Sequence, residues 1–257
     1  MNYYNEFDPS AAAWLRELIA NKIIPAGHVD TRSIADVSPS DLRGFTQCHF
    51  FAGIGGWAEA LRLAGWPADL PVWTGSCPCQ PFSAAGRQRG TDDERHLWPE
   101  FYRLIRECRP TVVFGEQVAS TLGREWLSGV RADLEGVGHE VGAADLCAAG
   151  VGAPHIRQRL YWVAHSNRSR IPRLEQSGNP SCVRQWNWRG KEDLLDLASN
   201  PFSANDRWPQ PIVRGMDDGI FARVVRLRGY GNAIVPQVAA EFIGAFCEAF
   251  EMKKDLT

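Results

Sequence analysis

The sequence predicts an α/β protein built on a doubly wound, mostly parallel β-sheet. Short apolar or β-branched segments alternate with helical segments over residues 48–164, and this alternation is typical of parallel sheets. Glycine-rich or polar motifs follow several of the expected strands, where open α/β sheets bind their ligands. The 257 residues are 44% hydrophobic, which is enough for a sizeable core.

Residues 1–47 are expected to form an N-terminal extension of helix and turns. Residues 11–24 predict an amphipathic helix. The apolar side chains that share one side of it are Trp14, Leu15, Leu18 and Ile19. Residues 25–44 are rich in turn formers and contain Asp30 and Asp36.

The core, residues 48–164, is expected to begin with a strand at 49–51 that runs into a glycine-rich turn. Such a turn lets the backbone approach a ligand closely, and the helix that follows favours a negative group at its N-terminus. The other expected helices are 57–64, 97–108 and 130–137, and the other expected strands are 71–75, 111–114, 142–146 and 159–164.

Two further segments follow the core. Residues 165–213 are rich in Ser, Asn, Pro, Arg and Trp and predict a small irregular lobe. Residues 214–257 become more apolar, and we expect this part to return to the core as a helix over much of 232–250.

Bulk composition gives broad limits. The net charge of -2 argues weakly against nucleic acid, but arginine is concentrated in residues 157–189 and 214–228. An odd number of cysteines, seven, does not suggest a disulfide framework, so we expect a reducing, cytoplasmic location. The start of the chain is polar and acidic, unlike a secretory signal, and no apolar run reaches the ~18 residues of a membrane span.

Taken singly, the polar motifs allow ordinary interpretations. Cys79 follows a proline in a polar loop, but most cysteines are buried and inert. Glu116 ends a strand, where a carboxylate is usually solvated, and Arg157 and Arg159 project to one side as a pair. No metal is expected, because the cysteine spacing does not match known zinc patterns. A dehydrogenase would leave the cysteine and arginine motifs unexplained.

In chain order, these motifs resemble those of the DNA cytosine-5 methyltransferase family of phages and bacteria. Residues 51–56 are similar to its cofactor motif and residues 78–83 to its nucleophile loop. Residues 116–118, Glu-Gln-Val, resemble its Glu-Asn-Val motif, and residues 157–159 its paired arginines. Residues 231–236 are similar to its Gly-Asn segment near the end of the chain.

The resemblance implies an enzyme of DNA modification, such as restriction–modification, that acts on a cytosine flipped out of the duplex. Cys79 would attack C6 as a thiolate and make C5 nucleophilic. Glu116 would protonate N3, Arg159 would hold O2, and Arg157 would lie near the target nucleotide or its phosphate. S-Adenosylmethionine would bind at Phe51, Gly53, Gly55 and Gly56.

The region that reads DNA in this family corresponds to residues 165–213. Arginines can read guanine edges and aromatic rings can wedge into a duplex, although the tryptophans could equally form a small core of their own. The expected contacts are Arg184, Trp186, Trp188 and Arg189, with Gln80 and Ser83 lining the loop over the flipped nucleotide and Asn232 in a structural role. So short a region suggests a short target or low specificity.

The main departure lies between Gly56 and Cys79, where only 22 residues stand. One helix and one strand use nearly all of them, since a parallel crossover takes a dozen or more residues. We therefore expect a class I methyltransferase-like sheet with a reduced strand number and a truncated cofactor pocket. Two smaller departures, Gln117 for Asn and His155 for Gln, keep hydrogen-bonding capacity.

Three hypotheses follow. In the first, the pocket is rebuilt from elsewhere, with Asp30 and Asp36 as candidates, and C5 is methylated. In the second, the same Cys79 adduct lets water displace the C4 amine, which deaminates cytosine to uracil without cofactor or zinc. In the third, the chain is a non-catalytic DNA binder, or half of an enzyme whose second subunit completes the cofactor site.

Overall fold

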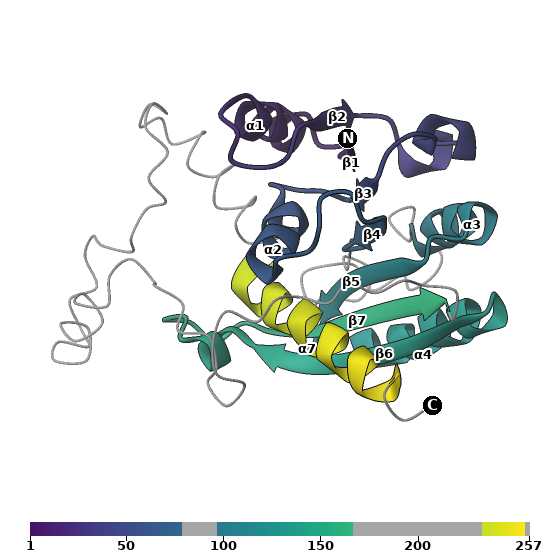
Figure 1. Ribbon diagram of the computed structural model, residues 1–257, viewed down its shortest axis with the longest axis vertical. Coiled ribbons are helices and arrows are strands. Elements are labelled where there is room, and N and C mark those ends of the chain that lie inside the picture. Colours follow the sequence, from purple (N-terminus) through teal and green to yellow (C-terminus); the bar gives the residue numbers. More distant parts are fainter. Residues whose placement is uncertain (79–96, 167–232, 255–257) are drawn as a thin grey trace, which may run out of the picture.

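The computed structural model describes residues 1–78, 97–166 and 233–254. The sheet has seven strands in the order β2-β1-β3-β4-β5-β7-β6 (Figure 1). Their bounds are β1 Asn2–Asn5, β2 Gly27–Asp30, β3 Gln47–Phe50, β4 Val72–Gly75, β5 Val112–Val118, β6 His139–Cys147 and β7 Gln158–Ser166. All pairs from β2 to β5 are parallel, whereas β7 is antiparallel to both of its neighbours. The predicted fold class is confirmed.

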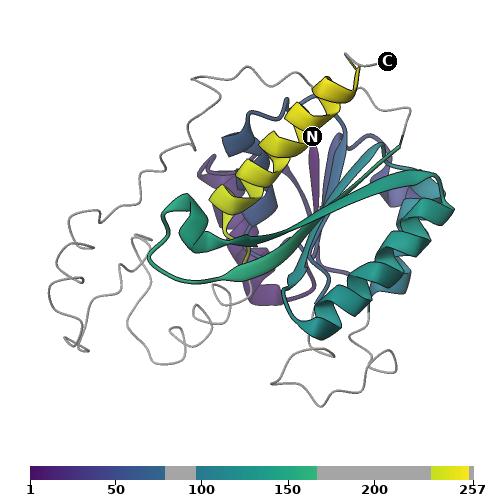
Figure 2. The same ribbon diagram turned by 90° about the horizontal axis from the view of Figure 1, so that it is seen from below.

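Helices cover both faces of the sheet, as Figure 2 shows for α7 and α4. One face carries α1 (Pro9–Ala20), α2 (Gly56–Ala64) and α7 (Pro236–Lys254). There Leu15 of α1 and Ala58 of α2 share one apolar cluster, and α2 and α7 share another. The opposite face is covered by α3 (Trp98–Cys108) and α4 (Thr121–Gly136). The sheet is therefore buried between two helical layers.

The expected reduction in strand number is wrong. Residues 1–47, expected as an extension, contribute β1, α1 and β2, a parallel crossover unit that belongs to the sheet. β1 lies beside β3, and β2 forms the outer edge. The strands that do not fit between Gly56 and Cys79 are thus supplied by a segment that precedes the glycine-rich turn in the sequence.

β1 lies inside the sheet, between β2 and β3, although two of its four residues are asparagines. The other two are tyrosines. Tyr3 and Tyr4 point to opposite faces, and both are at most 1% exposed. The Asn2 amide donates to Gln47 Oε1 at 3.1 Å, and the Asn5 amide donates to the Arg32 carbonyl at 2.9 Å. Because every buried polar side chain of this strand has a partner, the asparagines do not oppose its burial.

Some element boundaries also differ from the prediction. Helix α4 begins at Thr121, well before Val130, because the Ser120 hydroxyl accepts a hydrogen bond from the Gly123 N–H at 3.0 Å and caps the helix.

No helix within the described residues has both the length and the apolar character needed to cross a membrane.

A buried histidine joins β1, β3 and β4. His49 is 1% exposed, its Nδ1 lies 2.8 Å from Thr74 Oγ1, and its ring stacks on Tyr4 with centroids 5.0 Å apart. Burial lowers the pKa of His49 to about 3. The imidazole is therefore neutral in the folded protein at neutral pH.

We expect His49 to make folding pH-dependent. An unfolded histidine has a pKa of about 6.5, so its contribution to stability is complete above that pH and is lost as pH falls toward the folded pKa of about 3. The free energy of unfolding should fall by up to ~1.4 kcal/mol per pH unit in this window. Urea titrations at several pH values should show a shallower dependence for His49→Gln. Parallel curves for both proteins would contradict the prediction.

Candidate active site

The carboxyl ends of the parallel strands bring the sequence motifs to one edge of the sheet. Arg159, near the start of the antiparallel β7, reaches the same edge because it pairs with Val118 at the end of β5. The residues gathered there are Glu6 after β1, Asp30 ending β2, Phe51 after β3, Ser76 after β4 and Glu116 near the end of β5.

Glu116 is the buried acid of this edge. It is 7% exposed, and its Oε1 lies 2.9 Å from Arg159 Nε. Burial raises the pKa of Glu116, while the charges of Arg159 and Arg157 and a hydrogen bond from the Ser76 hydroxyl oppose that rise. A carboxyl group in this setting can hold and release a proton while cations steady its charged form.

Arg157 also belongs to this cluster. Its pKa is lowered by burial and by the neighbouring charge of Arg159, against the attraction of Glu116. Its Nη2 donates to the Ala233 carbonyl at 2.6 Å. Arg157 thereby ties the start of the C-terminal segment to the acid and the second arginine.

The glycine-rich turn combines close packing with open space. Gly53 and Gly55 have φ of +55° and +81°, a region that favours glycine. A Cβ at Gly53 would meet nothing within 4 Å, whereas one at Gly56 would lie 2.8 Å from Ile234 Cγ1. The Phe51 ring packs edge-on against Phe101. Of the three predicted cofactor glycines, Gly53 is the one at which a Cβ would meet no described atom within 4 Å.

Glu6 is a site residue that the sequence analysis missed. It follows β1, and its Oε2 accepts a hydrogen bond from the Gly53 N–H at 2.6 Å. Burial raises the pKa of Glu6, opposed by hydrogen bonds from the N–H groups of Asp8 and Gly53. Phe7 beside it is 71% exposed. The available signal is an aromatic pair, Tyr3 and Tyr4, two positions before an acid, but the composition of the first ten residues indicates only a polar and acidic segment.

Asp30 and Asp36, the two acids expected to rebuild the cofactor pocket, do not occupy a position like that of Glu6. Asp30 is 5% exposed and engaged, with its carboxylate accepting from Tyr3 Oη at 2.8 Å and from Arg32 Nη2 at 2.7 Å. Burial would raise its pKa, but the hydrogen bonds from Arg32 and Tyr3 dominate and lower it to about 2. Asp36 has an exposed side chain. Asp30 therefore fixes the loop that follows β2.

Several expected residues lie outside the described part of the chain. They are Cys79, Gln80, Ser83, Arg184, Trp186, Trp188, Arg189 and Asn232. For two of these residues, the adjoining residue in the sequence is described. Pro78, which precedes Cys79, lies at the edge where Glu116 lies, and Ala233, which follows Asn232, lies beside Arg157.

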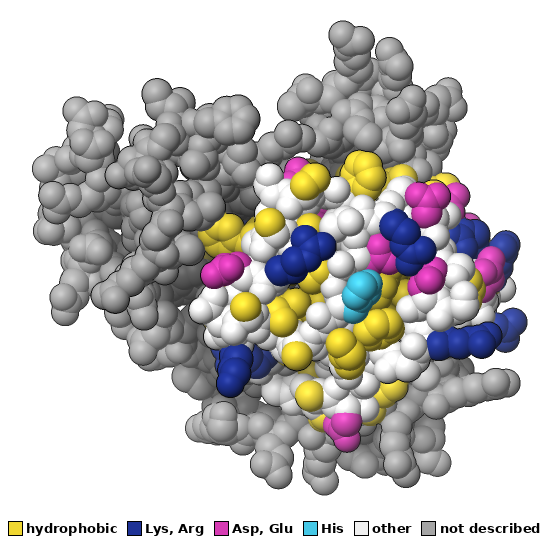
Figure 3. Space-filling view, turned by 90° about the horizontal axis from the view of Figure 1, so that it is seen from above, with side chains coloured by type: hydrophobic (Ala, Val, Ile, Leu, Met, Phe, Trp, Pro, Cys, Tyr) yellow, Lys and Arg dark blue, Asp and Glu magenta, His cyan; other side chains and the backbone are white. Residues whose placement is uncertain are grey.

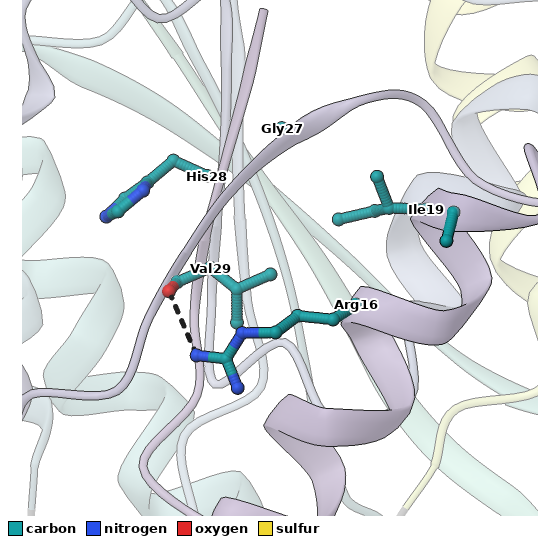
Figure 4. A pocket seen from close by; sticks show the side chains of 6 residues that line it. Arg16, Ile19, Gly27, His28 and Val29 are labelled. Carbon is teal, nitrogen blue, oxygen red and sulfur yellow. Dashed lines mark hydrogen bonds between the residues drawn. The ribbon is translucent and has the colours of Figure 1, made fainter.

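A hollow of about 470 Å³ lies elsewhere, between α1 and the outer strand β2 (Figure 4). Its lining is Arg16, Ile19, Ala20, Gly27, His28 and Val29. Seen from this side of the molecule, apolar, basic and acidic side chains are interspersed (Figure 3). None of the predicted site residues that the structure describes lines the hollow, so the candidate site remains the edge around Glu116 and Gly53.

Comparison with known proteins gives a family match and several relatives. Residues 66–208 match the family C-5 cytosine-specific DNA methylase. The type II methyltransferase M.AluI of Cellulosimicrobium cellulans is 34% identical over 169 residues, which cover 59% of this chain and 30% of that enzyme. M.AplI of Arthrospira platensis is 31% identical over 137 residues, which cover 52% and 34%. The chain thus spans about a third of the length of these relatives.

Among solved structures, the S. pombe Dnmt2 methyltransferase is similar, with a TM-score of 0.41 and 15% sequence identity. The match covers 72% of this chain and 58% of that one.

Gly115, directly before Glu116, should not tolerate a side chain. A Cβ there would lie 2.1 Å from the buried Trp162 ring, so we expect Gly115→Ala to destabilise the fold by about 3 kcal/mol or more through overpacking. Gly142→Ala on β6 is the matched control, because its Cβ would meet Val163 at an ordinary 3.6 Å. Urea unfolding measures the free energy of unfolding of both variants. Equal values for the two would contradict the expected overpacking at Gly115.

Proposed function

Because the chain belongs to the C-5 cytosine-specific DNA methylase family, we propose that it methylates C5 of cytosine in DNA through a covalent adduct between Cys79 and C6. The observation that carries the proposal is the ion pair between the buried Glu116 and the partly buried Arg159, with 2.9 Å between Nε and Oε1. The pair lies beside the end of β4, whose last residue, Gly75, stands four positions before Cys79 in the sequence. Acid, cation and nucleophile thus belong to adjoining strand ends.

Each residue has a defined part in the proposed reaction. The Cys79 thiolate forms a bond to C6, the C5–C6 π electrons move to C4–C5, and the C4–N3 π electrons move to N3, which takes the proton of Glu116. Arg159 donates to O2 and steadies the developing charge. C5 then takes up the methyl group, water removes the C5 proton as the C6–S bond breaks and the C5–C6 double bond re-forms, and the N3 proton returns to Glu116.

The neighbouring thiol is not a competing nucleophile. Cys77 is 6% exposed, and burial raises its pKa, so it remains a protonated core thiol. Two residues further on, Cys79 is the thiol that family resemblance assigns to the attack. Arg157, already bound to the Ala233 carbonyl, is proposed to hold the C-terminal segment at the site and to support the ionised form of Glu116.

The residues at the glycine-rich turn fit S-adenosylmethionine. The Glu6 carboxylate at the end of β1 can accept from ribose hydroxyls, and the exposed Phe7 ring offers a stacking surface for adenine. The backbone at Gly53 has open space for close approach. When bound, the molecule supplies an electrophilic methyl group.

This arrangement favours methylation over the other two hypotheses. The expected truncation rested on missing strands, and β1 and β2 fill those places in the sheet. A second subunit is not needed to complete the sheet. Residues 165–213 are proposed to read the DNA, with Arg184, Trp186 and Arg189 as contacts and Gln80 and Ser83 over the flipped base.

Removing the nucleophile should abolish the reaction. With DNA carrying tritium at cytosine C5, we expect tritium release and methyl transfer to fall at least ~1,000-fold in Cys79→Ala and ~100-fold in Glu116→Gln. Cys108→Ala, at the end of α3, is the control and should retain activity. Tritium release by Cys79→Ala at the wild-type rate would overturn the covalent mechanism.

Calorimetry should separate methylation from the alternatives. We expect the protein to bind S-adenosylmethionine and Glu6→Ala to bind it roughly 10- to 100-fold more weakly, because a hydrogen bond to a charged group is lost. Glu17→Ala, an exposed carboxylate on α1, should bind as the wild type does. If the wild type binds no S-adenosylmethionine and uracil accumulates in treated DNA, the reaction is deamination.

A further inference from the structure

Three polar groups connect the start of α2 to the acid of the site. The Trp57 Nε1–H donates to Ser76 Oγ at 3.0 Å. Gly75 pairs with Gly115 in the parallel register of β4 and β5, so Ser76 follows β4 opposite Glu116, and hydrogen bonding to Ser76 is one of the contributions that lower the pKa of Glu116. An indole nitrogen can only donate, so Ser76 Oγ is the acceptor in the first bond and its own hydrogen remains available for the Glu116 carboxylate.

The surrounding rings hold this chain of hydrogen bonds in one geometry. Trp57 is 4% exposed, stacks on Phe114 at 6.2 Å and meets Tyr161 edge-on at 6.2 Å. Phe114 and Glu116 lie on the same face of β5, two residues apart. The indole is therefore fixed on the face from which Glu116 projects.

We propose that Ser76 is a positioning residue for the Glu116 carboxyl group, and that Trp57 fixes the direction of the Ser76 hydroxyl. The inference rests on the proposed function, in which Glu116 protonates cytosine N3. It goes beyond that function because Ser76 and Trp57 have no assigned part in the proposed reaction. Ser76 selects one orientation of an acid that must meet N3 within hydrogen-bonding distance.

The same contact affects the proton on Glu116. Among the described residues, the titratable or charged groups that act on Glu116 are Arg157, Arg159 and Tyr161. Burial raises the pKa of Glu116, and the bond from Ser76 is one of the contributions that oppose the rise. Removing the hydroxyl should therefore raise the pKa further, whereas a purely structural defect would lower activity without moving it.

Difference infrared spectroscopy can measure this effect without DNA. The carboxyl band of Glu116 is identified as the band missing in Glu116→Gln and is followed as a function of pH. We expect its midpoint to move to higher pH in Ser76→Ala and in the same direction in Trp57→Phe, which keeps the ring and loses the N–H. Ser76→Thr, which keeps the hydroxyl, should restore the wild-type midpoint.

Thr74→Val is the matched control, because it removes a buried hydroxyl two residues away on β4 that contacts His49 and not Glu116. It should leave the midpoint unchanged. In parallel, tritium release from DNA labelled at cytosine C5 should be about tenfold slower in Ser76→Ala and recover in Ser76→Thr.

The outcomes separate the two proposals. If the wild type releases tritium but the midpoints of Ser76→Ala and Trp57→Phe equal that of the wild type, the positioning role is refuted and the proposed function stands. If the wild type releases no tritium, the proposed function fails, and the infrared midpoints still decide whether Ser76 acts on Glu116. Should Ser76→Ala not fold, Trp57→Phe decides.

Discussion

The pairing of β1 with β3 is the contact on which the half of the site around the glycine-rich turn depends. Asn2–Asn5 align with Gln47–Phe50 in parallel register, and the Ala52 N–H donates to the Asn5 carbonyl at 3.0 Å. This register sets Glu6 beside the glycine-rich turn, where the Gly53 N–H meets its carboxylate. A shift of one residue would turn every side chain of β1 to the opposite face. The buried bond between Asn2 and Gln47 opposes such a shift.

The half of the site around Glu116 depends on a balance of charges in a buried environment. Glu116 and its arginines come from strands that run in opposite directions, so an acid near the end of β5 meets a cation near the start of β7. Removing one member of such a pair would leave a buried charge without compensation. Tyr161 and Ser76 add to the same cluster, and the C-terminal segment is held there by Arg157.

Much of this arrangement follows from local sequence. The glycine-rich turn, the strands before Ser76 and Glu116 and the paired arginines carry composition and spacing that predict them directly. β1 could not be found in this way, because its two tyrosines between asparagines give no alternating pattern and its burial comes from partners about 45 residues away. The role of Glu6 was missed with it. Asp30 looked available in sequence, but Tyr3 and Arg32 occupy it through contacts that only the fold reveals.

The strand order has a consequence for how the chain can fold as it is synthesised. β1 and β2 form the first parallel pair; β3, β4 and β5 then each add to the same growing edge, and β7 closes with β6. Through β5, no strand has to enter between two that are already paired. The N-terminal part of a chain is made first during synthesis, so β1, which Glu6 follows directly, can serve as the template for the sheet. The glycine-rich turn would then form against a carboxylate already in place.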